Sequence, residues 1–179
     1  MSQIEVNYKG SEHKGDNIFV PLTSLEQAIE QIKRDLGEDE KLVDLIEELT
    51  DYVTNHPTRE IIGLENKLRN GQRDDLLDRA TLLKNRFERR VAKQQMSLAE
   101  QQVYAQILST ISTVWHHKIK PLIDINTSKT TIDKVIQEEL IEPVHKAIVR
   151  YDTIATMELV SGMLYFLTGK CHLIWNKSC

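Results

Sequence analysis

The chain has 179 residues, of which 40% are hydrophobic and 28% charged, and this composition predicts a globular protein of one domain, with room for a small appendage. The net charge of −4 excludes a uniformly basic nucleic-acid-binding surface, although it does not exclude a local basic patch. Two cysteines, Cys171 and Cys179, are too few to staple a secreted scaffold, so we expect a cytoplasmic protein. No segment has the pattern of a signal peptide or of a bilayer-spanning helix, and we expect no membrane association.

Residues 1–21 differ from the rest of the chain in their extended pattern. Ile4, Val6 and Tyr8 alternate with polar residues, which is typical of a strand, and a second extended stretch stops at Pro21. This pattern predicts a small hairpin, or a flexible arm that becomes ordered on a partner. We therefore divide the chain into an N-terminal arm or hairpin, residues 1–21, and a helical bundle domain, residues 22–179.

From residue 22 onward, apolar residues recur at intervals of three or four positions, which predicts helices. Thr23 with Glu26, and Ser97 with Glu100, have the spacing of capping boxes, in which side chains satisfy the free backbone N–H groups at the start of a helix. Glycine or proline follows most of the apolar stripes and is expected to end the helices. The predicted helices cover, in chain order, residues 23–36, 39–55, 58–70, 73–95, 97–120, 132–151 and 153–168.

Two prolines and the last helix shape the predicted bundle. Pro143 lies inside an apolar stripe, where it should kink or split the helix because proline lacks a backbone N–H and clashes with the preceding turn. The preceding predicted helix, over residues 97–120, should end ahead of Pro121. The helix over 153–168 is the most apolar and is expected at the centre, followed by a short extended or turn-like tail, residues 171–175. The predicted fold class is all-α: a multi-helix bundle with a small extended N-terminal element.

The sequence offers few groups for catalysis. It lacks the glycine-rich phosphate and dinucleotide motifs, the nucleophile elbow and the zinc-protease motif. His116 and His117 are adjacent on a helix, so they point about 100° apart and cannot easily share a metal ion. Cys171 and His172 have no second ligand pair at zinc spacing, which favours a buried cysteine and a hydrogen-bonded histidine. We predict a non-enzymatic protein with no catalytic residue, cofactor or metal.

Opposite charges gather in neighbouring segments. Residues 26–51 contain ten acidic and three basic side chains, which we interpret mainly as a solvated face, with magnesium binding or acid–base chemistry as the alternative. A basic face lies on the helix over 73–95, where cations three, four or seven positions apart share one side. It could pair internally, meet an acidic protein partner or grip nucleic-acid phosphates, although the lack of interleaved aromatic residues argues against stacking on single strands. The basic face consists of Lys84, Arg86, Arg89, Arg90 and Lys93.

The sequence Gly162-Met163-Leu164-Tyr165-Phe166-Leu167-Thr168-Gly169-Lys170-Cys171-His172-Leu173-Ile174-Trp175 resembles the closing segment of C-terminal domains in ABC-three-component systems. These are prokaryotic conflict (anti-phage, Lamassu-type) operons built around an SMC-like ATPase. Residues 62–68, residues 7–19, Pro121 and Pro143 are also similar to the pattern of that family. The resemblance implies a helical domain that tethers an effector, often a nuclease or protease, to the ATPase complex. Too little chain precedes the helices here to form an effector, so it implies a stand-alone subunit.

These patterns together predict a non-catalytic accessory or assembly subunit that tethers or regulates an SMC-like ATPase and an effector through protein contacts. The expected contact surfaces are the N-terminal arm, the basic face and the tail 171–175, with His172 and Trp175 as its named residues. The alternative is a helical nucleic-acid-binding regulator that uses the basic face 84–93. Nucleic acid could also be contacted through the complex.

Overall fold

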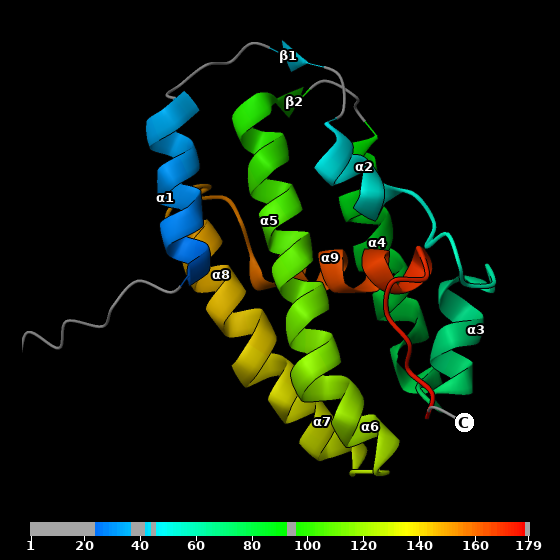
Figure 1. The fold of residues 1–179 in the computed structure, drawn as a ribbon. Coiled ribbons are helices and arrows are strands. Elements are labelled where there is room, and N and C mark those ends of the chain that lie inside the picture. Colours follow the sequence, from blue (N-terminus) through cyan, green and yellow to red (C-terminus); the bar gives the residue numbers. More distant parts are fainter. Residues whose placement is uncertain (1–23, 37–41, 44–45, 93–95, 178–179) are drawn as a thin grey trace, which may run out of the picture.

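The computed structural model describes residues 24–36, 42–43, 46–92 and 96–177 of the chain. Within these ranges the protein is an all-α bundle, as the sequence predicts, with a short antiparallel pairing of β1 (Leu42–Val43) and β2 (Met96–Ser97) (Figure 1). The predicted arm over 1–21 lies outside the described residues. The α-helices are α1 (Ser24–Leu36), α2 (Glu47–Val53), α3 (Gly63–Asn70), α4 (Leu77–Val91), α5 (Leu98–Val114), α6 (Lys120–Asp124), α7 (Lys129–Val135), α8 (Glu142–Val149) and α9 (Met157–Gly169).

The segment between α1 and α3 is less helical than predicted. The stripe over 39–55 predicts one helix, but in its described part Leu42–Val43 is a strand and the helix begins only with α2. Ile46, just before α2, is extended, and its backbone N–H donates to Gln101 Oε1 of α5 at 2.8 Å. α3 also begins later than predicted, because Gly63 has a φ of +76°, a left-handed conformation that interrupts a right-handed helix.

Both prolines in the second half of the chain follow a π-helical turn. The prediction that a helix ends ahead of Pro121 is wrong, because α5 runs into the π-helical turn Trp115–Ile119 and then directly into α6. The turn Ile136–Ile141 likewise joins α7 to α8 just ahead of Pro143, which agrees with the expected break in regular helix. A wider turn relieves the clash between a proline ring and the preceding carbonyl, so each helix continues in modified form.

Three helices end in the same backbone motif, and in each a residue other than glycine is left-handed. Gln72, Asn126 and Cys171 follow α3, α6 and α9 with φ values of 58°, 56° and 68°. The N–H groups of the left-handed residue and of the next residue bond back to the last turn, as in a Schellman motif. Gly71 and Gly169 are predicted to end helices, and α3 and α9 do end there, but the left-handed position lies further along the chain. The bond that spans five positions of the chain joins Arg73 N to Leu68 O, Thr127 N to Leu122 O and His172 N to Leu167 O.

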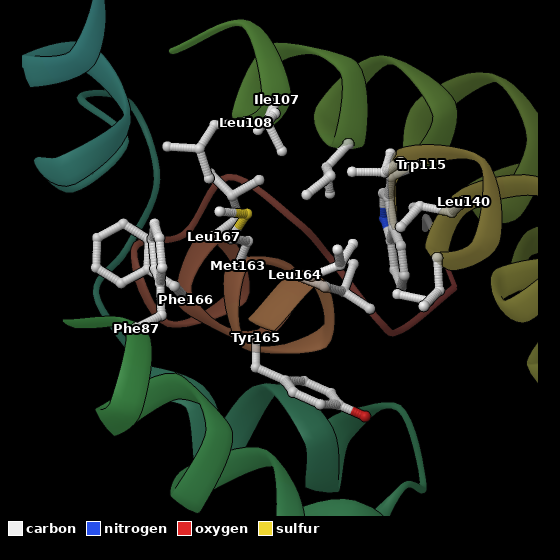
Figure 2. Close-up of a cluster of buried hydrophobic side chains, with 14 of the residues drawn as sticks. Phe87, Ile107, Leu108, Trp115, Leu140, Met163, Leu164, Tyr165, Phe166 and Leu167 are labelled. Atoms are coloured by element: carbon white, nitrogen blue, oxygen red, sulfur yellow. The ribbon is translucent and has the colours of Figure 1, made fainter. Parts of the chain in front are cut away.

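The last helix forms the centre of the bundle, as predicted. α9 runs behind α5 and across its direction in Figure 1, and residues 162–168 are all buried. Figure 2 shows Met163 and Leu167 pointing toward Ile107 and Leu108 of α5, with Tyr165 on the opposite side of α9. None of the described helices combines the length and the apolar character that crossing a membrane requires.

A glycine allows α9 to pack closely against α4. A Cβ atom added to Gly162 would lie 2.7 Å from the Leu83 carbonyl oxygen, which is too close for van der Waals contact. Beside this point Phe87 of α4 packs edge-on against Phe166 of α9, with ring centroids 5.1 Å apart. The close approach brings the large aromatic side chains of both helices into one layer of the core (Figure 2).

Replacing Gly162 by alanine should therefore separate α4 from α9. We expect Gly162→Ala to lower the free energy of unfolding by about 2–3 kcal/mol, because the clash is with backbone and overpacking of a core is typically this costly. The matched control is Ser161→Ala, which removes one exposed hydrogen bond to Met157 O and should change stability by less than about 1 kcal/mol. Urea denaturation of both variants measures the difference, and equal stabilities would contradict the close packing.

Candidate partner-binding surface

The chain after α9 folds back onto the bundle. Cys171 is left-handed and completely buried, and its thiol donates a hydrogen bond to the Glu60 carbonyl oxygen at 3.3 Å. A non-glycine residue in this conformation carries a steric cost of roughly 1–2 kcal/mol. The motif at the end of α9 and the bond to Glu60 hold it there. The predicted role of Cys171 as a buried cysteine agrees with this placement.

Two cations bind the carbonyl groups of the returning chain. Arg59 Nη1 donates to the carbonyl oxygens of Cys171 at 2.9 Å and His172 at 2.6 Å. Lys67 Nζ donates to the carbonyl oxygen of Leu173 at 3.2 Å, and only 5% of Lys67 is exposed. Burial lowers the pKa of the Lys67 ammonium from its usual value. Cations at the C-terminal end of a helix also interact favourably with its dipole, so Arg59 and Lys67 satisfy buried acceptors and stabilise the end of α9.

His172 joins the returning chain to the loop after α2. Its Nε2 lies 3.1 Å from the Thr54 carbonyl oxygen, so the ring donates from Nε2 in its neutral form. The ring centroids of Tyr52 and His56 lie 5.7 Å and 5.6 Å from that of His172. Burial lowers the pKa of His172, and the nearby charge of Arg59 acts in the same direction. The pKa of His56 is lowered by the same two causes.

Trp175 anchors the end of the returning chain in the core. Only 3% of it is exposed, and its ring lies 4.6 Å from that of Trp115 and 6.4 Å from that of Tyr165, centroid to centroid. Its indole N–H donates to Thr168 Oγ1 at 3.0 Å. A Cβ atom added to Gly71 would lie 2.7 Å from the Trp175 Cβ, so glycine permits this approach. We call residues 170–175, with Arg59 and Lys67, the C-terminal clasp.

The clasp alters the expected role of its two predicted contact residues. His172 and Trp175 are both buried in their own chain, where they hold the tail in place. Contact with a partner through these two side chains therefore stays a prediction and requires the clasp to open. Sequence reasoning missed Arg59 and Lys67, although Lys67 lies between Leu64 and Leu68 on the inward stripe of α3, which is a signal for a buried cation.

The basic face of α4 is largely paired within the chain. Lys84 Nζ lies 2.6 Å from Glu88, Arg86 Nη1 lies 3.0 Å from Glu158, and Arg90 Nη2 lies 2.7 Å from Asp152. The pair of Arg86 connects α4 to the start of α9, and the pair of Arg90 connects it to the loop before α9. Arg89 is exposed and has no ion pair with any described residue. Lys93 lies outside the described residues, so the predicted basic face is only partly visible.

Exposed apolar side chains flank these arginines. Leu82 of α4 is 50% exposed, Met157 at the start of α9 is 43% exposed, and Ile154 in the preceding loop is 75% exposed. Glu158, the neighbour of Met157, lies 3.8 Å from Arg79 Nη2 as well as binding Arg86, so the first turn of α9 lies beside the outer side of α4. We call this area the α4–α9 surface. It consists of Arg79, Leu82, Arg86, Arg89, Ile154 and Met157.

The remaining candidates for chemistry are separated. His116 and His117 are exposed on the π-helical turn, and His116 Nδ1 lies 2.7 Å from the Ser112 carbonyl oxygen. His145 Nε2 lies 3.2 Å from the Ala155 carbonyl oxygen, on another side of the bundle. Among the described residues, no group of three or more histidine, cysteine or acidic side chains is placed to hold a metal ion.

Removing the Trp175 ring should destabilise the whole bundle. We expect Trp175→Ala to lower the free energy of unfolding by about 3–5 kcal/mol, the usual cost of removing a buried aromatic side chain. Trp175→Phe keeps most of the packing and loses the bond to Thr168, so its expected cost is smaller, about 1–2 kcal/mol. Chemical denaturation of the two variants tests this order. A loss below about 0.5 kcal/mol for Trp175→Ala would show that the tail is not part of the core.

Lowering the pH should loosen the clasp through His172. Because the folded-state pKa lies below the usual value of about 6.5, the unfolded chain binds a proton more readily, and stability falls as the pH drops below that value. We expect the melting temperature of the wild type to fall more between pH 7.5 and 5.5 than that of His172→Gln. The control is His117→Gln, at an exposed position, and its melting temperature should depend on pH as that of the wild type does. If the melting temperatures of all three proteins depend on pH in the same way, this pH dependence does not come from His172.

Comparison with known protein families identifies the family of this chain. The model of C-terminal domain 9 of the ABC-three component (ABC-3C) systems matches residues 63–175, which is well over half of the chain. The match begins at the first residue of α3 and ends at Trp175, so it includes α4, α9 and most of the clasp. Searches of the curated proteins and of the solved structures found no match. The chain belongs to the family of C-terminal domain 9 of the ABC-three component systems.

Proposed function

We propose that this protein is a non-catalytic assembly subunit of an ABC-three component system, acting in the cytoplasm. In this role it tethers or regulates an SMC-like ATPase and its effector within an anti-phage complex through protein contacts. The observation that carries the proposal is the family match over α3 to Trp175, since a domain of a multi-component system works beside other proteins. This match covers most of the helical bundle, whereas the resemblance seen in the sequence rested mainly on residues 162–175.

The α4–α9 surface is the contact area that we assign to this role. Arginine and large apolar side chains are enriched where proteins bind one another, and here Leu82, Ile154 and Met157 stand exposed beside Arg79 and Arg86. The ion pairs to Glu158 hold the two arginines in place before a partner arrives. Such preorganisation reduces the entropy lost on binding.

The interior of the described bundle supports a structural role. His172 and Cys171, the histidine and cysteine of the family-like segment, are engaged with the carbonyl groups of Thr54 and Glu60. Lys67 and Arg59 bind the carbonyl groups of the clasp. Groups that carry out chemistry in other proteins serve here to fix the end of α9.

Nucleic-acid binding by the basic face is the weaker candidate. Lys84, Arg86 and Arg90 each have a carboxylate partner within 3.0 Å, so a phosphate would have to displace that partner. Binding of this kind would fall steeply with added salt, because released counterions drive it. DNA affinity that drops with salt and weakens in Arg86→Gln and Arg89→Gln would favour this candidate.

Co-expression with the other proteins of its operon tests the proposed function. We expect the tagged chain to retain the ATPase component through purification, and Leu82→Glu to reduce the retained amount about tenfold, because a buried charge at an interface costs more than 1.4 kcal/mol. The matched control is Ile125→Glu, at a more exposed apolar position after α6 that lies outside the α4–α9 surface and should retain the wild-type amount.

The two parts of the proposal can fail separately. If no operon component elutes with the wild-type chain, the assembly role is wrong. If the component is retained equally by the wild type and by Leu82→Glu, the α4–α9 surface is wrong while the assembly role stands.

A further inference from the structure

A pocket lies where the Schellman motifs after α3 and α6 meet the end of the clasp. It has a volume of about 370 Å³ and is lined by the turn after α3, the turn between α6 and α7, and residues 175–177. In Figure 1 these segments come together at the foot of the bundle, near the end of the chain. A pocket of this volume is within the usual range for small-molecule sites.

The charge of the pocket lining is positive. Arg73, Lys129 and Lys177 line it, and no carboxylate side chain does. Arg73 is neutralised from outside the pocket, at 2.8 Å by Asp133 and at 3.2 Å by Asp75. Neither lysine lies within ion-pair distance of a described carboxylate, although the charge of Lys129 interacts at longer range with that of Asp75. The two lysines therefore add two positive charges to a pocket whose described lining has no acidic side chain, which favours an anionic ligand.

Uncharged hydrogen-bonding groups complete the pocket lining. Gln72 and Asn126, the left-handed residues after α3 and α6, lie on its two walls, together with Ser128. Their amide and hydroxyl groups can donate to phosphate oxygens and can also pair with the polar edge of a larger ligand. Trp175 and Ile123 supply apolar surface for a ring or an alkyl part. The lining thus combines a cationic end with mixed polar and apolar walls.

From this combination we infer that the pocket binds a small organic phosphate of about the size of a nucleoside monophosphate, with Lys129 and Lys177 on its phosphate group. A phosphate monoester carries a charge of about −1.5 to −2 at neutral pH, which the two lysines match. Such a ligand joins the α3–α4 turn, the α6–α7 turn and the end of the clasp, so it should stabilise the bundle by binding the folded state. This site does not depend on the α4–α9 surface or on the assembly role.

Calorimetric titration with adenosine monophosphate, inorganic phosphate and adenosine tests the assignment. We expect adenosine monophosphate to bind the wild-type chain and to raise its melting temperature, with adenosine binding at least about tenfold more weakly because it lacks the charge. In Lys129→Gln/Lys177→Gln the affinity for adenosine monophosphate should fall about tenfold or more. Binding of inorganic phosphate that weakens in the same variant would also support the site.

The matched control is Arg34→Gln/Lys146→Gln, which removes two exposed cations that have no ion pair with described residues and lie away from the pocket. It should bind as the wild type does. The inference is overturned if neither phosphate-bearing probe binds at millimolar concentration. It is also overturned if adenosine binds as tightly as its monophosphate, or if the loss of Lys129 and Lys177 leaves the affinity unchanged. Circular dichroism shows whether the variants remain folded.

Discussion

Burial of the last helix, together with the chain that follows it, is the constraint on which the bundle depends. α9 is enclosed over residues 162–168 and residues 171–173 are buried as well, so the carbonyl groups of this chain end need partners within the protein. Arg59 and Lys67 bind three successive carbonyl groups there, and the left-handed Cys171 turns the chain back. The returning chain then adds Trp175 to the core beside Trp115. The C-terminal clasp is therefore part of the helical core rather than an appendage to it.

The packing of α9 against α4 also determines which sides of these two helices remain exposed. The close contact between α4 and α9 at Gly162 uses the inner sides of both helices for packing. Their outer sides present arginines held by Glu158 and Asp152, with exposed Leu82 and Met157 between and beside them. The proposed assembly role uses these outer sides for binding, and the chain belongs to a domain family of multi-component systems.

The sequence predicts those features that depend on local pattern. The stripe of α9, the helix cap at Ser97 and the change of helix at Pro143 depend on neighbours within a few positions, and the structure confirms each of them. Pro121 is harder to predict, because the helix continues past it through a π-helical turn whose Trp115 and Ile119 are buried in the core, and local pattern does not reveal that packing. The strand at Leu42–Val43 likewise depends on a partner more than fifty positions away.

The candidate sites depend still more on distant contacts. Arg86 and Glu158 are 72 positions apart, and Arg59 reaches His172 across 113 positions, so spacing along the chain cannot reveal either contact. The basic face was visible in the sequence, and internal pairing was one of its expected uses, but its partners Glu158 and Asp152 could not be identified. Trp175 shows the same limit, since a tryptophan near a chain end reads equally well as an exposed contact or as a core anchor.

Native-state hydrogen exchange of the isolated chain tests most directly whether the clasp belongs to the core. The backbone N–H of His172, which donates to Leu167 O, should exchange as slowly as the amides of α9, with the free energy of global unfolding. Exchange of His172 and Leu173 at the rate of an exposed loop, while α9 stays protected, would contradict the account by showing that the clasp opens independently.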